Sequence, residues 1–384
     1  MKVLLLIHGL DVGGAEAIVA DLARFLRAGG DAVEVGCLGE LGRIGEELRP
    51  EGIPVHLHAR RPGFDATLPA RLAWQVRAGR FDVVHAHQRT ALFYGMLAGL
   101  AHRVPTVYTE HGPLGVPQAK ARQRVFNRLL RWRLSRITAV SDDAARGLAC
   151  GEGFRGRPIS VIPNGVDVRH WRMAAEGADR AALRTRCGLP VAGVVLGAVG
   201  RLHAVKNHAL LVRALADIRR RRSDAALVLV GDGPERETLA ALARRHDVAG
   251  AVHFLGLRRD VAQILPAFDV FCLPSQWEGI PLTLLEAMAA RVPVVAAATG
   301  GIPEAVRHER EALLVPISSS SGAPMHGSEG SPDAASFAVA AERLLSDGEL
   351  RTRLANAALA RVEAQFDIAA VCRRYRELLA SVVA

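Results

Sequence analysis

Short runs of β-branched and other apolar residues alternate with longer amphipathic stretches along most of the chain, a pattern typical of parallel strands joined by crossover helices. In the first half, the predicted strands are Val3 to Ile7, Ala32 to Cys37, Pro54 to Leu57, Asp82 to His85, Thr106 to Tyr108, Ile137 to Val140 and Ile159 to Ile162. Between the first two strands, apolar residues recur at helical spacing from Ile18 to Leu26. Parallel strands buried under helices indicate an α/β fold.

The alternation stops after Asp167 and starts again at Val194. The strands predicted for this second half are Val194 to Val199, Leu227 to Val230, Val252 to Leu255, Val270 to Leu273 and Val294 to Ala296. Because 384 residues exceed the usual size of one hydrophobic core, we predict two doubly wound domains, at 1–170 and 190–367. Ligands of such sheets bind beyond the carboxyl ends of the strands, so the loops at those ends are the candidate sites.

The composition fits a folded protein without a membrane span, since half of the residues are apolar, 23% are charged and no apolar run approaches the length of a spanning helix. Met1 to Ile7 lacks the basic lead and cleavage site of a signal peptide, so we interpret it as the first buried strand. The five cysteines are scattered without a Cys-x-x-Cys pair, which predicts neither a disulfide framework nor a zinc site and fits a cytoplasmic protein. The net charge of +10 suits phosphates, nucleic acid or an acidic membrane surface, but it also fits the arginine-rich composition.

The first strand-to-helix loop, His8 to Glu16, contains the pair Gly13 and Gly14. Glycines there let a phosphate or sugar approach backbone N–H groups at a helix N-terminus. Gly9 and Gly14 have the spacing of a P-loop, but alanine and glutamate stand in place of its lysine and hydroxyl residue, and no Gly-x-Gly-x-x-Gly is present. An ATPase or a dehydrogenase is therefore disfavoured, and a tight turn without a ligand stays open.

Two further loops at strand ends carry charged residues. Arg201 and Lys206 precede a helix that begins near His208, where two cations would neutralise a diphosphate leaving group. In the segment Ser275 to Met288, Pro281 suits the first position of a helix, so the N–H groups after Glu278 and Gly279 would point at an anion.

Glu286 lies about two turns into this predicted helix, so Glu278 and Glu286 would bind hydroxyls of two different parts of one ligand. Alternatively, Glu286 is an ordinary helix residue. Its apolar neighbours predict a largely buried helix, however, in which a lone carboxylate needs a partner.

These loops, with Val161 to Asp167, Val230 to Pro234 and Phe254 to Gly256, closely resemble the large retaining glycosyltransferase family four, and the match covers nearly the whole chain in the right order. The resemblance implies the GT-B architecture, two Rossmann-like domains facing across a cleft, with the C-terminal helix at about 368–384 packed back on the first. It also implies transfer of a hexose-type sugar from a UDP- or GDP-sugar to a glycan or lipid-linked acceptor, with retention of the anomeric configuration. Nucleotide-sugar epimerisation or hydrolysis, and nucleotide-sugar binding without turnover, are the alternative functions.

The resemblance assigns roles to individual residues. Arg201 and Lys206 would bind the donor diphosphate, Glu278 the donor sugar, and Glu286 the ribose hydroxyls. The remaining donor-site positions are Gly279, Ile280 and Pro281 along the phosphate and sugar, Arg258 at the nucleobase, and Gly14 closing over the donor from the first domain.

His111, between Glu110 and Gly112 at a strand end, matches a family position where a histidine reaches the transferred sugar or the acceptor. An isolated histidine is more often structural, so this role depends on the resemblance. His85 and His87 share the strand-end location, and their spacing of two suggests metal ligands, but no third ligand follows from the sequence. Because the family does not generally require a metal, we expect no metal or other cofactor beyond the donor substrate.

The segment from Lys120 to Arg136 contains seven basic residues and no acidic one, interleaved with apolar residues. It predicts a basic amphipathic helix that would rest on the inner face of an anionic membrane or, equally, pack its apolar side onto the first sheet. We expect no nucleic-acid partner. Residues 318–332, rich in Ser, Gly and Pro, replace the short linker of the family and predict a flexible surface loop.

Overall fold

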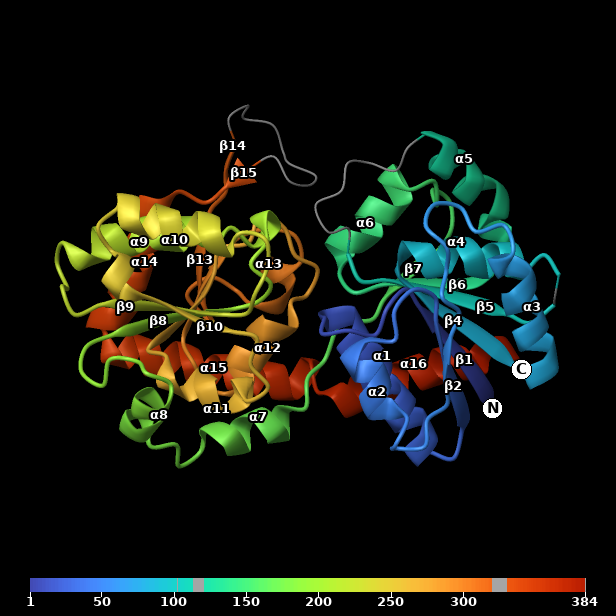
Figure 1. Cartoon of the computed structure of the whole chain (residues 1–384), viewed down its shortest axis with the longest axis horizontal. Coiled ribbons are helices and arrows are strands. Elements are labelled where there is room, and N and C mark those ends of the chain that lie inside the picture. Colours follow the sequence, from blue (N-terminus) through green and yellow to red (C-terminus); the bar gives the residue numbers. More distant parts are fainter. Residues whose placement is uncertain (102, 113–120, 320–329, 384) are drawn as a thin grey trace. The chain divides into compact units, whose positions relative to one another are not determined.

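A computed structural model describes residues 1–101, 103–112, 121–319 and 330–383 (Figure 1). The chain divides into two compact units, Met1–Gly165 together with Ile368–Ala384, and Val166–Asp367. The second unit begins at Val166 rather than at residue 190, because helices α7 (Val168–Ala175) and α8 (Arg180–Arg186) pack against other elements of that unit. The alternation of strands and helices does not reveal this boundary. The two helices follow each other without a strand between them, and the next strand belongs to the second sheet.

The first unit contains a seven-stranded parallel sheet in the order β3-β2-β1-β4-β5-β6-β7. The strands are β1 (Lys2–Ile7), β2 (Ala32–Cys37), β3 (Val55–Leu57), β4 (Val83–His87), β5 (Thr106–Glu110), β6 (Leu134–Ala139) and β7 (Ile159–Val161). All seven predicted strands are confirmed, with ends that differ by a few residues. Both faces of β1 are fully buried, which is why its sequence is a continuous apolar run instead of an alternating one.

Helices cover both faces of this sheet (Figure 1). One face packs against α1 (Gly14–Ala28), α2 (Gly42–Leu48) and α16 (Ile368–Val383). The other face packs against α3 (Leu68–Gly79), α4 (Gln88–Ala98), α5 (Ala121–Leu130) and α6 (Asp142–Gly151). The C-terminal helix therefore belongs to the first unit, where Tyr375 and Leu379 enter the core.

The second unit contains a six-stranded parallel sheet in the order β10-β9-β8-β11-β12-β13. The strands are β8 (Val195–Val199), β9 (Ala226–Val230), β10 (Val252–Gly256), β11 (Val270–Leu273), β12 (Val294–Ala297) and β13 (Leu313–Val315). The first five agree with the sequence pattern, whereas β13 has only three residues, which are too few to show a period. This order is that of the Rossmann fold.

Two helical layers cover the second sheet. One consists of α9 (His208–Arg219), α10 (Arg236–Arg245) and α14 (Ala334–Ser346). The other consists of α7, α11 (Val261–Ile264), α12 (Leu282–Ala289), α13 (Ile302–Ala305) and α15 (Gly348–Gln365). The short 3₁₀ helices η2 (Ala204–Lys206), η3 (Ala249–Ala251) and η4 (Leu265–Ala267) lie in the connections.

Two predicted segments differ from expectation. The basic helix ends at Leu130, η1 (Arg131–Arg133) follows, and β6 begins at Leu134, so a single helix reaching Arg136 is wrong. The reason is that Leu134 and Ile137 are buried in the sheet. Lys120 and residues 320–329 lie outside the described residues, and the loop predicted at 318–332 contains a short antiparallel pair, β14 (Ser318–Ser319) with β15 (Gly330–Ser331).

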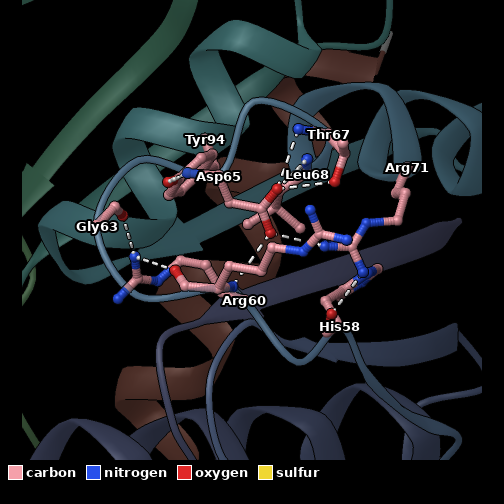
Figure 2. A network of polar contacts seen from close by, with 9 residues as sticks. His58, Arg60, Gly63, Asp65, Thr67, Leu68, Arg71 and Tyr94 are labelled. Carbon is pink, nitrogen blue, oxygen red and sulfur yellow. Dashed lines mark hydrogen bonds and ion pairs between the residues drawn. The ribbon is translucent and has the colours of Figure 1, made fainter.

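A buried carboxylate organises the connection from β3 to α3 (Figure 2). Asp65 accepts hydrogen bonds from the Thr67 hydroxyl at 2.7 Å, the Leu68 amide at 3.2 Å and the Arg71 guanidinium at 2.9 Å. The Tyr94 hydroxyl of α4 accepts from the Asp65 amide at 2.9 Å. These donors compensate the cost of burying the charge and hold the connection against two helices.

The strand order changes direction between β1 and β4 in the first sheet and between β8 and β11 in the second, while all strands stay parallel. In doubly wound sheets the connections leaving such neighbouring strands diverge, and ligands bind at the carboxyl ends there. The loops with Gly14, with Arg201 and Lys206, and with Glu278 follow β1, β8 and β11, whereas His111 follows β5 and Arg258 follows β10. Among the described residues, no helix is long and apolar enough to cross a membrane.

Candidate functional site

In the second unit, the loops that follow β8 and β11 are bonded to each other. The Gln276 amide donates to the Val205 carbonyl at 2.9 Å, and the Asn207 side chain donates to the Pro274 carbonyl at 3.3 Å. Two segments that lie about 70 residues apart in the sequence therefore form one surface at the switch point of the sheet.

A lysine and a glutamate form the centre of this surface. The Lys206 ammonium lies 2.6 Å from Oε1 of Glu278, and the Ser275 hydroxyl donates to the same oxygen at 2.7 Å. Glu278 is only 7% exposed, and the two donors compensate the burial of its charge. Because an ammonium has three donor hydrogens, Lys206 can bind Glu278 and a phosphate oxygen together.

The backbone at Glu278 rests on a glycine pair after β12. The Gly301 amide donates to the Glu278 carbonyl at 3.0 Å, and the Thr299 hydroxyl donates to the Gln276 carbonyl at 2.7 Å. A Cβ atom on Gly300 would lie 2.0 Å from the Glu278 carbonyl oxygen. Ser275, Thr299 and this glycine pair were not predicted from the sequence, although two consecutive glycines shortly after a strand were a visible signal.

Glu286 is the fifth residue of α12, so it lies about one turn into the helix and not two. Pro281 is the N-cap residue, one position before its predicted place, because the helix begins at Leu282. The side chain of Glu286 is half-buried and burial raises its pKa to about 8. Within the described part of the chain no group donates a hydrogen bond to it, so this carboxyl group is available to a ligand that carries hydroxyl groups.

Other predicted residues lie around this centre. Gly279, Ile280 and Pro281 are buried in the turn that joins Glu278 to α12. Arg258 follows β10 and pairs with both oxygens of Asp260, at 2.8 and 2.6 Å, an interaction that raises the pKa of the guanidinium and fixes its plane. Arg201 is exposed. The structure thus joins Lys206 to the Glu278 turn, whereas no described hydrogen bond joins Arg201, Arg258 or Glu286 to that pair.

In the first unit, Gly14 is the exposed first residue of α1, and Gly13 before it is the N-cap. The Glu16 carboxylate folds back over Gly13 and accepts from the Gln88 side chain at 2.7 Å. Burial raises the pKa of Glu16. Gln88 starts α4, so this contact joins the connections after β1 and β4, the two strands at the switch point.

His111 follows β5 and forms a hydrogen bond with His87 of β4, with 2.9 Å between Nε2 of His111 and Nδ1 of His87. The ring of His85 lies 4.0 Å from that of His87. Beside them, the Glu110 carboxylate accepts from the Tyr108 hydroxyl at 2.7 Å and the Gly112 amide at 3.0 Å. The sequence predicts these histidines only as separate strand-end residues, because their contact depends on β4 and β5 being neighbours.

Burial sets the protonation of these rings. It lowers the pKa of His85 to about 3 and of His111 to about 4, the latter against a hydrogen bond with Asn164 that raises it, and it lowers the pKa of His87 well below its usual value. All three are neutral near pH 7. No group of three or more His, Cys, Asp or Glu in the described ranges could hold a metal ion.

Two family models match this chain. The model described as Glycosyltransferase Family 4 matches residues 12–170, and the model described as Glycosyl transferases group 1 matches residues 193–347. D-inositol 3-phosphate glycosyltransferase of Kribbella flavida is 32% identical over 342 residues, which are 80% of this chain and 79% of that protein. The chain belongs to glycosyltransferase family four.

Similarity to this glycosyltransferase extends to other members and to solved structures. The glycosyltransferase EpsF of Bacillus subtilis is 30% identical over 222 residues, so the match spans 56% of this chain and 57% of EpsF. The crystal structure of HepE from Anabaena in complex with UDP and glucose is similar with a TM-score of 0.85 and 26% identity, over 99% of this chain and 100% of HepE. The two Rossmann-like units are those of the GT-B fold.

Proposed function

We propose that this glycosyltransferase moves a hexose from a UDP- or GDP-sugar to an acceptor hydroxyl and retains the anomeric configuration. The observation that carries the proposal is the pair of Lys206 and Glu278, a cation and a buried carboxylate bonded at 2.6 Å beside the carboxyl ends of β8 and β11. A diphosphate needs a cation such as Lys206, and sugar hydroxyls need a hydrogen-bond acceptor such as the Glu278 carboxylate. The similarity to HepE, which was crystallised with UDP and glucose, supports a UDP-sugar over a GDP-sugar.

In the reaction, negative charge collects on the leaving diphosphate while positive charge develops on the sugar. We propose that Lys206 and Arg201 stabilise the diphosphate, so that no metal cofactor is needed. One preorganised contact of this kind contributes roughly 3 kcal/mol, or about 100-fold in rate. Glu286 would accept from the ribose hydroxyls, and Gly279, Ile280 and Pro281 would line the phosphate and sugar.

Glu278 is better suited to hold the sugar than to attack it. Its Oε1 already accepts from both Lys206 and Ser275, and these hydrogen bonds reduce the nucleophilicity of a carboxylate. Retention would then follow from attack of the acceptor on the face that the diphosphate leaves, with the leaving phosphate receiving the acceptor proton.

The test is a turnover screen with UDP-, GDP- and ADP-sugars, followed by NMR of the product's anomeric proton. Transfer that yields the donor's own anomeric configuration supports the proposal, and an inverted product contradicts retention. Consumption of donor at the same rate without acceptor would favour a hydrolase or epimerase. Binding without turnover across the acceptor panel would favour a non-catalytic protein.

We propose a glycan or lipid-linked acceptor. The Kribbella relative is named for D-inositol 3-phosphate, so the panel should pair oligosaccharides and lipid-linked sugars with that small phosphorylated alcohol. Transfer to the inositol phosphate alone would contradict this part of the proposal.

We also propose that α5 and η1 contact an anionic membrane surface. Their apolar residues divide into two sets: Phe126 and Leu130 pack on the core of the first unit, whereas Val125, Leu129 and Trp132 are 57%, 69% and 67% exposed. The guanidinium groups of Arg131 and Arg157 lie 5.0 and 5.5 Å from the Trp132 ring. An exposed apolar stripe flanked by arginines fits the boundary between anionic headgroups and acyl chains.

Flotation with phosphatidylglycerol vesicles and with phosphatidylcholine vesicles tests this contact. Binding to the anionic vesicles should be lost on changing Arg128 and Arg131 to glutamate. The same change at Arg244 and Arg245, at the end of α10 in the second unit, is the matched control and should leave binding intact. Equal flotation of both double variants would overturn the proposal.

A further inference from the structure

The turn that carries His111 is closed by the carboxylate of the residue before it. Oε1 of Glu110 accepts a hydrogen bond from the Gly112 amide at 3.0 Å, and Oε2 accepts from the Tyr108 hydroxyl at 2.7 Å. The Glu110 side chain therefore reaches past His111 and bonds to the backbone on its far side. Glu110 is only 3% exposed, so this carboxylate lies inside the protein. The proposed transfer assigns no role to it.

The backbone of Glu110 is part of the sheet, whereas the backbone of Gly112 is not. Glu110 is the last residue of β5, where it pairs with Ala139 of β6, and its carbonyl accepts from the Val140 amide at 3.1 Å. Gly112 has a φ of +117°, in the left-handed region that favours glycine, so the chain turns away from the sheet at this point. Among the described residues, the Glu110 carboxylate is the group that accepts from the Gly112 amide. The carboxylate therefore ties the turn to the sheet.

An arginine of α4 compensates the buried charge. Arg89 is the second residue of α4, and its Nε lies 3.6 Å from Oε2 of Glu110, while its Nη2 lies 2.7 Å from Oε1 of Glu152. The side chains of Glu110 and Glu152 are 4% and 8% exposed, so one guanidinium serves two buried carboxylates. Buried ion pairs add little stability compared with apolar residues of the same volume. The position that Glu110 gives to the turn explains its presence better than stability does.

The imidazole of His111 has an anchor of its own. Its Nε2 lies 2.9 Å from Nδ1 of His87 on the neighbouring strand β4, and this hydrogen bond orients the ring whichever of the two histidines donates. The backbone around His111 is thus fixed through Glu110, and its ring is fixed through His87. A side chain that must meet a reacting group needs both kinds of support, because a displacement of about 1 Å already lowers the rate of an enzyme strongly.

We infer that Glu110 is a positioning residue, which holds the turn after β5 so that His111 keeps a fixed place toward the transferred sugar or the acceptor. Glu110 does not itself contact a substrate, because its two oxygens are occupied by Gly112 and Tyr108. The role of His111 toward the substrate rests on the proposed function, whereas the anchoring of the turn rests only on contacts within the first unit.

Exchange of the Gly112 amide hydrogen with solvent tests the anchor without any need for turnover. Labelling glycine with ¹⁵N and histidine with ¹³C at the carbonyl reduces the NMR spectrum to glycines that follow a histidine, and the signal lost in His111→Gln is that of Gly112. In Glu110→Gln the side-chain oxygen can still accept from this amide, whereas Glu110→Ala removes the acceptor. We expect slow exchange in the native protein and in Glu110→Gln, and exchange at least about 10-fold faster in Glu110→Ala, the loss expected for a hydrogen bond to a charged group.

Kinetics test whether the anchor acts through His111. Glu110→Ala should lower kcat by roughly 10-fold to 100-fold, because the freed turn misplaces His111, and Glu110→Gln should restore most of the rate. The KM for the donor should change little, since Lys206 and Glu286, which are proposed to bind it, lie in the second unit. In a His111→Ala background, Glu110→Ala should cause no further loss of kcat, because the residue on which it acts is gone.

Asp65→Ala is the matched control, because Asp65 is a carboxylate of the same unit that is 2% exposed and also accepts from backbone amides. It should lower Tm but leave kcat intact, and unfolding curves verify that each variant is folded at the assay temperature. Losses from Glu110→Ala and His111→Ala that add up in the double variant would overturn the inference, as would equal Gly112 exchange in the native protein and Glu110→Ala. Absence of turnover in the native protein would count against the proposed function, while the exchange rates would still decide the anchor.

Discussion

Gly300→Ala tests whether the Glu278 turn must keep its position for transfer. Gly300 has φ of +52°, and a Cβ there would lie 2.0 Å from the Glu278 carbonyl oxygen, where real Cβ contacts stay above 3.0 Å. The turn that carries Glu278 must therefore retreat by about 1 Å, and a displacement of that size costs on the order of 100-fold in rate. Alanine in this left-handed conformation also costs about 1 to 2 kcal/mol of stability.

Gly188→Ala separates the two effects. Gly188 has a similar φ of +65°, but a Cβ added there would have no atom within 4 Å, so the substitution carries the backbone cost alone. Urea unfolding should show a loss of about 1 kcal/mol or more in both variants. Steady-state transfer with the responding donor should show the large loss of kcat/KM only in Gly300→Ala. Equal kcat/KM for the two variants would show that transfer does not depend on the position of the Glu278 turn.

Three further outcomes are expected. Burial raises the pKa of Glu286 from its usual 4.5 to about 8 in the folded protein. The stability that its protonated form contributes is therefore complete below about pH 4.5 and is lost as pH rises through 8. Glu286→Gln should flatten this fall in the free energy of unfolding, measured with urea. Hydrogen bonds, first that of Thr67, depress the pKa of Asp65, so Asp65→Asn should lower Tm at neutral pH, and the difference should shrink in acid as the native carboxyl loses its charge (Figure 2). Lys206→Met should lower kcat/KM by about 100-fold, whereas a metal chelator should leave the native rate unchanged in the same assay.

Most strands could be predicted because both sheets are buried on both faces, which makes each strand a visible apolar run. β13 was too short to stand out, and the arginines after Leu130 made the first three residues of β6, Leu134 to Arg136, look like the end of a helix. Helix positions were less certain than strand positions, as the one-residue error at Pro281 and the missing turn before Glu286 illustrate. The local sequence pattern locates an apolar segment more accurately than it locates the residue at which a helix begins its hydrogen bonds.

Candidate site residues could be predicted where they lie within a single strand-to-helix loop. Arg201, Lys206, Glu278 and Glu286 lie in strand-to-helix loops or just after them, and their residue types already indicate a diphosphate and hydroxyl groups. The support of Glu278 by Gly300 and the contact of His87 with His111 were not predictable in the same way. Each joins segments that become neighbours only through the strand order, which the sequence pattern does not reveal.

The proposed function depends most on the binding of a nucleotide-diphosphate sugar by Lys206 and Glu286. Isothermal titration of UDP-, GDP- and ADP-sugars into the native protein, Lys206→Ala and Glu286→Ala measures this directly. We predict that one donor class binds the native protein and that both variants bind it at least about 10-fold more weakly, the loss expected for a charge-assisted contact. Binding of that donor with unchanged affinity to both variants, or of no donor to the native protein, would show that these residues do not form the donor site.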